Sequence, residues 1–398
     1  MDNTPHNSLA SGTWNLIVFT LLHFLVDTVA GQMSPLWPAL KQHYLLGEGG
    51  TFWLLLIWTM ATSFSQLGFG LLGDSAVGRK LVWFGPVVGA ICLGCVGLST
   101  SPIVLCTLLI CGGLGIAAFH PEGATLAGNS WPTARSRSIS IFAMGGFLGQ
   151  AAGPYCSGLI VDRFGLSGLS GGIAVALALI LSLRFAFRET PSVPRSQAFD
   201  AAHEAVQVLR KHYVLVSLLV LSGTLRVVAA SGVPVALSYW LAAKDFPKSE
   251  VGLVQSCFMA GIGLGGLASA LFVKPRTEQF ALWLIPTISV PFIALIPQLE
   301  GLALKGATGV SGLLIGIALP VFISYGQQLL PESQRVASSL TMGVSWGTGG
   351  AIVAALIDQC DRHQQFDFAF VGFSLTVIAS SLLGLLLPRV THKTSIDR

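Results

Sequence analysis

The polar and apolar positions of this 398-residue chain divide it into long apolar runs that are separated by short polar loops. Each run has about 20 residues, the length at which a helix crosses the hydrocarbon core of a membrane. Lipid offers the backbone no hydrogen-bond partner, so each run is predicted to be an α-helix. We predict twelve spans, at residues 14–40, 51–73, 81–100, 102–127, 138–161, 168–187, 213–241, 250–273, 280–299, 306–329, 336–358 and 367–388.

The longest polar interval, residues 188–212, divides the spans six and six. Its first part is rich in Pro and Ser, and its second part places Phe199, Ala202, Val206 and Leu209 on one side of a helix. We therefore expect an all-α membrane protein with an N-terminal six-helix half at 1–188 and a C-terminal half at 213–398. A cytoplasmic linker with an amphipathic helix is expected between them, at 189–212.

The two halves repeat each other in the placement of polar residues. Asp27 follows Trp14 by 13 residues in the first span, and Arg226 follows Tyr213 by 13 residues in the seventh. We also match residues 119–122 near the end of span four with residues 325–328 near the end of span ten. Repeats that carry polar groups to the middle of the membrane are typical of alternating-access transporters.

Composition and charge agree with a membrane protein. Hydrophobic residues make up 53% of the chain and charged residues 10%, well below the charged share of soluble domains. With both termini in the cytoplasm, fifteen Lys and Arg residues fall on the cytoplasmic side and six on the other, and Arg226 lies inside a span. The net charge of +4 thus reflects topology and not nucleic-acid binding, and we predict a multi-pass protein of the inner (plasma) membrane.

The first dozen residues contain no Lys or Arg, so a removable signal peptide is not expected. The seven cysteines are interpreted as packing residues, without a disulfide or a metal. His120 and Glu122, two residues apart with a proline between them, make a poor metal site, and no catalytic triad or nucleotide loop is evident. We predict no cofactor, no metal and no enzymatic activity.

The loop sequence GLLGDSAVGRK, Gly70–Lys80, resembles the cytoplasmic signature of the major facilitator superfamily. It has one extra residue between Asp74 and Gly78. The resemblance implies that Asp74 and Arg79 form a conformational latch between the halves. A plain solvated turn is the alternative.

Span five carries GGFLGQAAGP, Gly145–Pro154, which resembles the glycine-proline signature of antiporters in the same superfamily. Glycines at helical spacing allow close helix contact, and Pro154 bends the helix. General packing of small residues explains the pattern equally well.

Five His, Asp, Glu or Arg residues lie away from the ends of the predicted spans: His23, Asp27, His120, Glu122 and Arg226. Each costs roughly 2.5 to 3.5 kcal/mol in the membrane, so such residues usually face a cavity or a partner. Four of them are candidates for proton coupling: Asp27, His23, His120 and Glu122. A static ion pair from Asp27 or Glu122 to Arg226 is the alternative, and His120 is also explained as a packing residue.

Arg226 is the candidate for holding an anionic group, because a guanidinium stays charged and fits a carboxylate or phosphate. Aromatic residues near helix ends are more often interface anchors, which weakens the case for Trp37 and Trp240. The other candidates for substrate binding are Gln32, Tyr325, Gln327, Gln328 and Trp346.

Longer segments resemble one family of the superfamily, the fosmidomycin resistance proteins. They are HFLVDTVAGQMSPLWPAL, FHPEGATLA, LRVVAASGVPVAL and the stretch from Tyr325 to Asp358. That family exports drugs in exchange for protons, which implies the same activity here. Gln328 stands where we match an acidic residue of the family, so a role for charge at that position is not carried over.

The leading hypothesis is a proton-coupled antiporter for efflux of a small amphipathic or anionic compound. A proton-coupled uptake symporter of an anionic metabolite is the alternative, since Arg226 serves both. The expected partners are a small-molecule substrate, protons and the lipid bilayer, and the chain is expected to be a monomer that binds no nucleic acid.

Overall fold

The computed structural model describes residues 5–72, 76–131, 134–188, 207, 209–330 and 337–388. Within these residues the chain is helical and has no β-strand. The helices of the first half are α1 (Pro5–Gly31), α2 (Trp37–His43), α3 (Gly50–Thr59), α4 (Ser65–Leu72), α5 (Ala76–Gly94), α6 (Pro102–Ser130), α7 (Arg135–Phe164) and α8 (Gly171–Ala186). The helices of the second half are α10 (Tyr213–Ala242), α11 (Lys248–Phe272), α12 (Glu278–Leu295), α13 (Gly301–Leu329), α15 (Ser345–His363) and α16 (Asp367–Leu386).

Eleven helical segments in the described residues are long and apolar enough to cross a membrane. In one of them, a π-helical stretch at Met60–Phe64 joins α3 to α4. The fifth predicted span, α7, is 30 residues long but is not among the eleven. It contains five glycines, several serines and Gln150, which lower its hydropathy.

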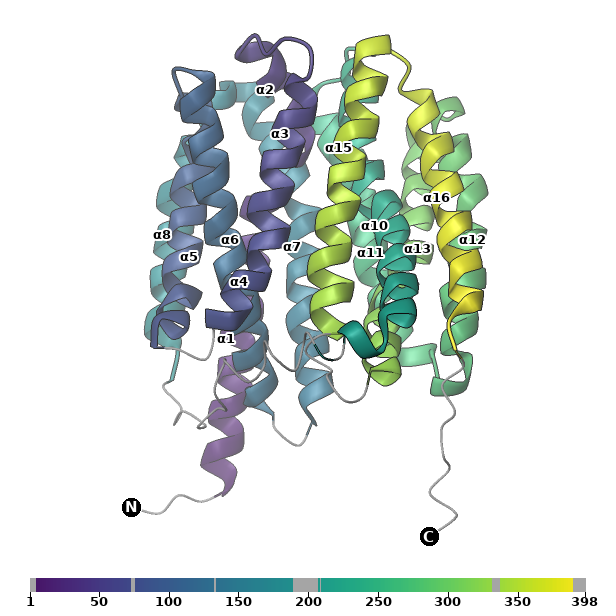
Figure 1. Cartoon of the computed structure of the whole chain (residues 1–398). Coiled ribbons are helices and arrows are strands. Elements are labelled where there is room, and N and C mark those ends of the chain that lie inside the picture. The colour runs from purple at the N-terminus through teal and green to yellow at the C-terminus, as the bar shows by residue number, and fades with distance from the viewer. Residues whose placement is uncertain are drawn as a thin grey trace.

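The first turn of α1 and the last turn of α16 lie at the same end of the bundle (Figure 1). We call this the near end, and the opposite end, with α2 and the turn between α15 and α16, the far end. Because the first and the last helix have these ends on the same side of the bundle, the chain between them crosses the membrane an even number of times. With α7 added to the eleven segments, the structure is consistent with twelve spans.

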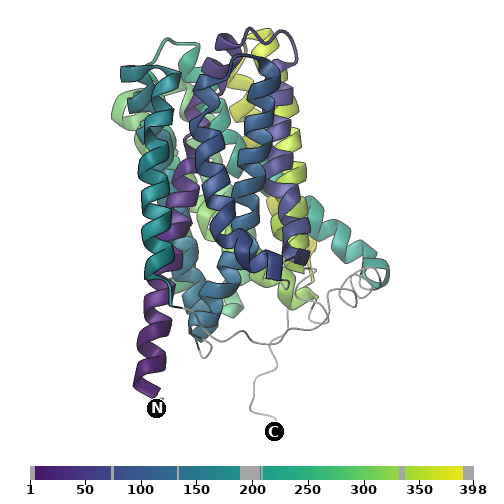
Figure 2. The same ribbon diagram turned by 90° about the vertical axis from the view of Figure 1, so that its left-hand side faces the viewer.

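The helices of the two halves form two groups that stand side by side in Figure 1, and in Figure 2 the first half lies in front of the second. Large apolar side chains such as Phe185 and Leu302 are more than 80% exposed on the outside of the bundle. Such a surface suits contact with lipid. Residues 189–206 and 208 of the predicted linker lie outside the described residues.

The helix bounds reveal how the halves correspond. Helix α13 begins and ends 199 residues after α6, and α15 ends 199 residues after α7. The same shift relates Asp27 to Arg226 and Pro121 inside α6 to Pro320 inside α13. The predicted match of residues 119–122 with 325–328 is therefore wrong by about two helical turns, because similar residue types and not helix bounds suggested it.

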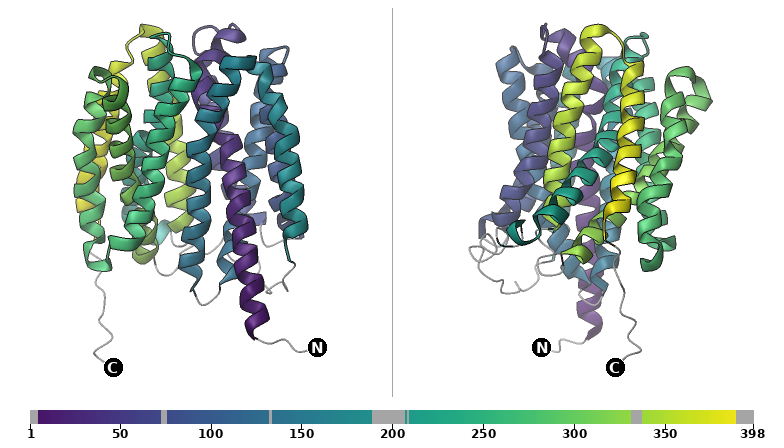
Figure 3. Two further views of the ribbon diagram at one scale, coloured as in Figure 1. Left: turned by 180° about the vertical axis from the view of Figure 1, so that it is seen from behind. Right: turned by 45° about the vertical axis from the view of Figure 1, so that its right-hand side comes forward.

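Helix α7 contacts both halves at once (Figure 3, left). A side chain at Gly149 would collide with the carbonyl of Phe24 on α1, and one at Gly252 of α11 would collide with the carbonyl of Pro154 on α7. Glycine at these two positions lets the backbones approach closely. Helix α7 thus connects the interior of the first half to the second half.

Candidate functional site

Asp27 lies one turn before the end of α1, near the middle of the membrane-spanning segment Ser11–His43, and is 4% exposed. Its Oδ1 atom is 3.2 Å from Nε2 of His120 on α6, and its Oδ2 atom is 3.4 Å from Nε2 of His23 one turn earlier on α1. The structure thus brings together three of the four predicted proton-coupling residues. We call His23, Asp27 and His120 the acid-imidazole cluster.

The second nitrogen of each imidazole fixes how its ring is protonated. Nδ1 of His23 is 2.8 Å from the carbonyl oxygen of Phe142, and Nδ1 of His120 is 2.9 Å from that of Ile116. A carbonyl only accepts, so Nδ1 of each ring carries hydrogen and donates. Nε2 of each ring then faces a carboxylate oxygen, and such a contact is favourable only when a proton lies between the two atoms. The contact of His23 with Oδ2 and the contact of His120 with Oδ1 can therefore each hold one proton, so the cluster can hold up to two.

A third helix contributes to the cluster. Nε2 of Gln150 on α7 donates to Oδ2 of Asp27 at 3.1 Å. The backbone of α7 also lies close by, since a Cβ built at Gly146 would be 2.8 Å from Oδ2 of Asp27. Sequence reasoning placed Gln150 within the glycine-rich motif of span five but missed it as a site residue.

Glu122 is also buried on α6, at 4% exposure, but it is not part of this cluster. The ligand-type atoms of His23, Asp27 and His120 lie within 4.8 Å of one another. Imidazole nitrogens and a carboxylate at such distances also suit a transition metal. The expectation of no metal stays a prediction.

Arg226 is 3% exposed and lies within the second half. Its Nη2 atom donates to the carbonyl oxygen of Leu282 on α12 at 3.1 Å, and its guanidinium carbon is 5.1 Å from the ring centroid of Phe322 on α13. Its Nε and Nη1 atoms have no hydrogen-bond partner within the described residues. Arg226 forms no ion pair with Asp27, whose partners among the described residues come from the first half.

The other predicted substrate residues differ in whether their side chains already have hydrogen-bond partners. The hydroxyl of Tyr325 donates to the carbonyl of Pro388 at 2.7 Å, and Nε2 of Gln327 donates to Oγ of Ser338 at 2.8 Å. Nε2 of Gln328 donates to Glu278 at 2.9 Å. Gln32 and Trp346 are half-buried. Of the predicted latch, Arg79 is exposed on α5, and Asp74 lies outside the described residues.

The halves are joined at the far end by contacts that sequence reasoning missed. Oδ2 of Asp361 on α15 is 2.5 Å from Nζ of Lys41 on α2 and accepts from Oγ1 of Thr51 on α3 at 2.5 Å. Nearby, Oδ1 of Asp358 accepts from the backbone N–H of Phe52 at 3.1 Å. These carboxylates meet the first turn of α3, where backbone N–H groups lack helical partners.

A related contact joins the other pair of helices. The two carboxylate oxygens of Asp162 on α7 accept from the backbone N–H groups of Lys248 and Ser249 at 2.9 and 2.8 Å, in the first turn of α11. Asp162 and Asp361 are 199 residues apart. Each half therefore places an aspartate at the end of its fifth helix against the start of the other half's second helix. We call both sets the far-end contacts.

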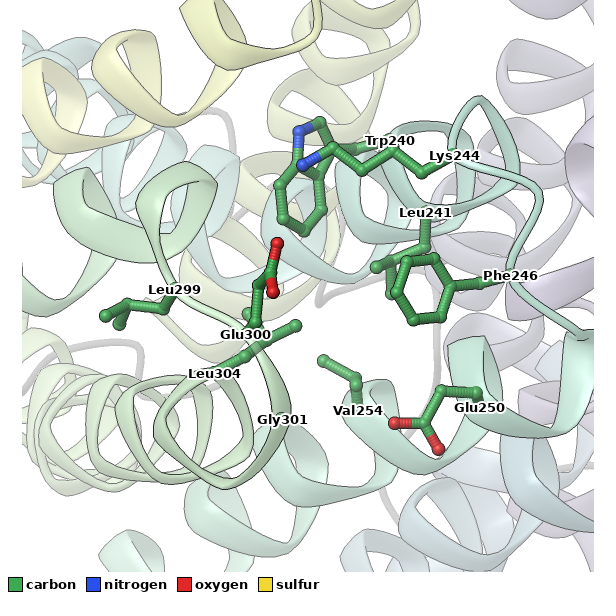
Figure 4. Close-up of a pocket in the computed structure, with 10 residues that line it drawn as sticks. All are labelled: Trp240, Leu241, Lys244, Phe246, Glu250, Val254, Leu299, Glu300, Gly301 and Leu304. Atoms are coloured by element: carbon green, nitrogen blue, oxygen red, sulfur yellow. The ribbon is translucent and has the colours of Figure 1, made fainter.

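A small pocket lies in the second half, where α10, α11 and α13 meet (Figure 4). Nζ of Lys244 lies 3.9 Å from the ring centroid of Trp240, and the carboxylate of Glu300 points toward this ring, while Glu250 lies on another side of the pocket. None of the predicted proton-coupling or substrate residues lines this pocket.

The comparisons with known proteins agree with this architecture. The chain is 27% identical to the uncharacterized MFS-type transporter YfnC of Bacillus subtilis (strain 168), with 93% of this chain and 90% of the relative covered. It is 21% identical to the fosmidomycin resistance protein of Escherichia coli (strain K12), with 94% and 92% covered. The solved structure of the nucleoside transporter NupG covers 94% of this chain and 99% of its own, with a TM-score of 0.72 at 13% identity.

A family model described as Major Facilitator Superfamily matches residues 17–355, most of the chain. The predicted fold class is confirmed, and so is the prediction of a transporter rather than an enzyme. This chain is a multi-pass membrane transporter and belongs to the Major Facilitator Superfamily.

Proposed function

We propose that the protein exports a small amphipathic or anionic compound in exchange for protons, by alternating access. The observation that carries the proposal is the acid-imidazole cluster, in which three titratable side chains share two proton positions. Buried ionisable groups in membrane helices are typical of proton pathways. The likeness to the fosmidomycin resistance protein supports export and a role in drug resistance.

Exposure of the cluster suggests how protons reach it. The side chain of His120 is 23% exposed, while that of Asp27 is 5% exposed. His120 is thus the member through which a proton enters or leaves, and Asp27 is the buried acceptor. In the exchange cycle, protons would bind from the outside and leave to the cytoplasm, and the substrate would move in the opposite conformational step.

The division at residues 189–212 and the cytoplasmic location of both termini are part of the proposal. The loop charges support that orientation, with fifteen basic residues against six. The far-end contacts then close the site from the outside. We propose that the protein works as a monomer, and that Asp74 and Arg79 act at the near end.

The direction of transport is tested with right-side-out membrane vesicles loaded with a compound panel that includes fosmidomycin. Acidifying the outside by about two pH units should speed the loss of the exported compound several-fold, because protons entering drive the exchange. Vesicles without the protein are the control. Counterflow measured together with proton flux tests the alternative, since a symporter would move protons and substrate in the same direction and acid outside would slow the loss.

The proposal gives Arg226 the role of binding the anionic part of the substrate. Support comes from its two nitrogen atoms without partners, Nε and Nη1, and from the absence of an ion pair between its guanidinium and any carboxylate of the described residues. A buried guanidinium in this state is costly for the fold. The effect of replacing Arg226 on stability can therefore show whether Arg226 binds the substrate or stabilises the fold through a partner.

Replacement of Arg226 by methionine should therefore stabilise the protein while it weakens anion transport. We expect the free energy of unfolding to rise by about 1 to 4 kcal/mol, seen as a higher melting temperature in detergent. The KM for anionic compounds should rise about 10- to 100-fold, the value of a hydrogen bond to a charged group. Neutral compounds should be transported as before.

The matched control is Arg163→Met, which removes an exposed arginine at the end of α7. It should leave both the melting temperature and KM close to those of the parent. A lower melting temperature for Arg226→Met, with unchanged KM for anions, would assign Arg226 to structure and remove it from the substrate site.

A further inference from the structure

Gln150 occupies a position that links the acid-imidazole cluster to the rest of the molecule. Its amide N–H donates to Oδ2 of Asp27 at 3.1 Å, and this is the oxygen that also faces His23 at 3.4 Å. The other oxygen, Oδ1, is left to meet His120 at 3.2 Å. The amide thus holds the carboxylate in the orientation in which each imidazole has an oxygen of its own.

The helix that carries Gln150 also forms the boundary between the halves. One turn beyond Gln150, the carbonyl of Pro154 packs against Gly252 of α11. Three turns beyond it, Asp162 accepts the backbone N–H groups of Lys248 and Ser249. A movement of α7 at Gln150 would therefore displace the first turns of α11 through these contacts.

We propose that Gln150 is the positioning residue of the proton site, and that it transmits the protonation of Asp27 to α11. This inference rests on the proposed function. A carboxylate oxygen accepts the amide N–H, but a carboxyl group with its proton on Oδ2 donates at that position. When that hydrogen points toward Gln150 and not toward His23, the amide of Gln150 must turn so that its carbonyl oxygen accepts. This turn takes place on the helix that contacts the other half.

Few groups besides Gln150 determine the charge state of Asp27. Among the described residues, the titratable side chains in contact with its carboxylate are His23 on the same helix and His120 on α6. Helix α7 contributes an uncharged amide in hydrogen-bond contact. Removing that amide takes one donor from the carboxylate and leaves both imidazoles in place.

The first test is Gln150→Leu in the purified full-length protein, with infrared difference spectroscopy as a function of pH. The carboxyl band of Asp27 is identified by its loss in Asp27→Asn. With one donor to the carboxylate gone, the pH midpoint of this band should rise by about one unit. Gln150→Met, which keeps the length of the side chain, should give the same shift. This measurement needs no substrate, so it stands apart from any test of transport.

The matched control is Ser157→Ala on the same helix, whose hydroxyl donates to the carbonyl of Pro154 and does not touch the cluster. It should leave the midpoint unchanged. A purely structural role for Gln150 would lower the melting temperature without moving the midpoint. An unmoved midpoint in both Gln150 variants would overturn the inference.

The second test follows the connection to α11. Hydrogen exchange at residues 248–252 should change in a step at the pH where the Asp27 band titrates in the parent protein. In Gln150→Leu that step should be lost, because the amide that senses the proton is absent. A step that persists at the same pH in Gln150→Leu would show that protonation reaches α11 by another route and would overturn this part.

Discussion

Replacement of Asp27 by asparagine is expected to abolish uphill transport while exchange of substrate down its gradient continues. One pH unit corresponds to a tenfold ratio, so one proton per substrate under about two units of pH difference sustains a substrate ratio of about 100. An amide takes up no proton in this range. The ratio that the pH gradient sustains should therefore fall to about one.

The asparagine variant should fold, because its amide has the shape of the carboxyl group it replaces. Its oxygen still accepts from Gln150, and its NH₂ group can donate to Nε2 of a neutral His120. Reconstituted vesicles with an imposed pH gradient measure accumulation, and counterflow in the same vesicles measures exchange.

Asp367→Asn is the matched control for this experiment. Asp367 accepts from Nε1 of Trp240 at 2.9 Å at the far end and has no contact with the cluster. Its replacement should leave the sustained ratio near 100. Accumulation that survives in Asp27→Asn but is lost in Asp367→Asn would move the proton site away from α1.

The sequence predicts the helices well because crossing a membrane is a local property. Twenty apolar residues in a row leave few alternatives, and even α7, with its low hydropathy, was placed at residues 138–161 within the observed Arg135–Phe164. The pairing of His23 with Asp27 was also accessible, since residues four apart share a helix face. Such inferences need only the spacing along one helix.

Contacts between helices could not be predicted from the sequence because they depend on how each helix is rotated about its axis. His120 meets Asp27 across 93 residues, and Gln150 meets it across 123. The repeat placed Arg226 at the position that corresponds to Asp27, but not the fact that its guanidinium faces α12 and α13. The substrate role of Arg226 therefore stays a prediction.

The far-end aspartates show a different limit. Asp162 and Asp361 lie at the ends of spans. Charged residues are common there because the adjoining loops are polar, so neither aspartate indicates a specific contact. Their partners are backbone N–H groups or residues of the opposite half, which no pattern within one span reveals. The shift of 199 residues between them was a signal in the sequence, and helix bounds were needed to recognise it.

Replacement of Asp361 by asparagine should open the far end of the protein. Lys41 is a quarter exposed and Asp361 is 9% exposed, so loss of one charge leaves the other largely buried without a partner. Breaking such a pair costs about 3 kcal/mol at the lower end of the observed range, which corresponds to a shift of roughly 100-fold toward the open state. The variant should populate conformations in which the halves are separated at this end.

Distances between spin labels measure this opening directly. Leu45 and Leu302 are 89% and 86% exposed, in the first and second half, so each can be replaced by a cysteine that carries a label once the seven native cysteines have been removed. The Asp361→Asn variant should convert most of the short-distance population into a longer one. The same change should make uphill transport inefficient, because the site can then be reached from the far end at the wrong step.

Two further substitutions decide which part of the contact holds the far end closed. Asp162→Asn removes a carboxylate that accepts from two backbone N–H groups and from Ser249 and has, within the described residues, no buried lysine partner like Lys41, so its effect should be about fivefold. Glu48→Gln removes an exposed side chain 3.8 Å from Arg362 and should change the population less than that. If the increase in the open population is largest for Asp361→Asn, smaller for Asp162→Asn and smallest for Glu48→Gln, the buried ion pair is the dominant restraint. Equal effects of all three would mean that general charge at this end, and not the pairing of Lys41 with Asp361, keeps the halves together.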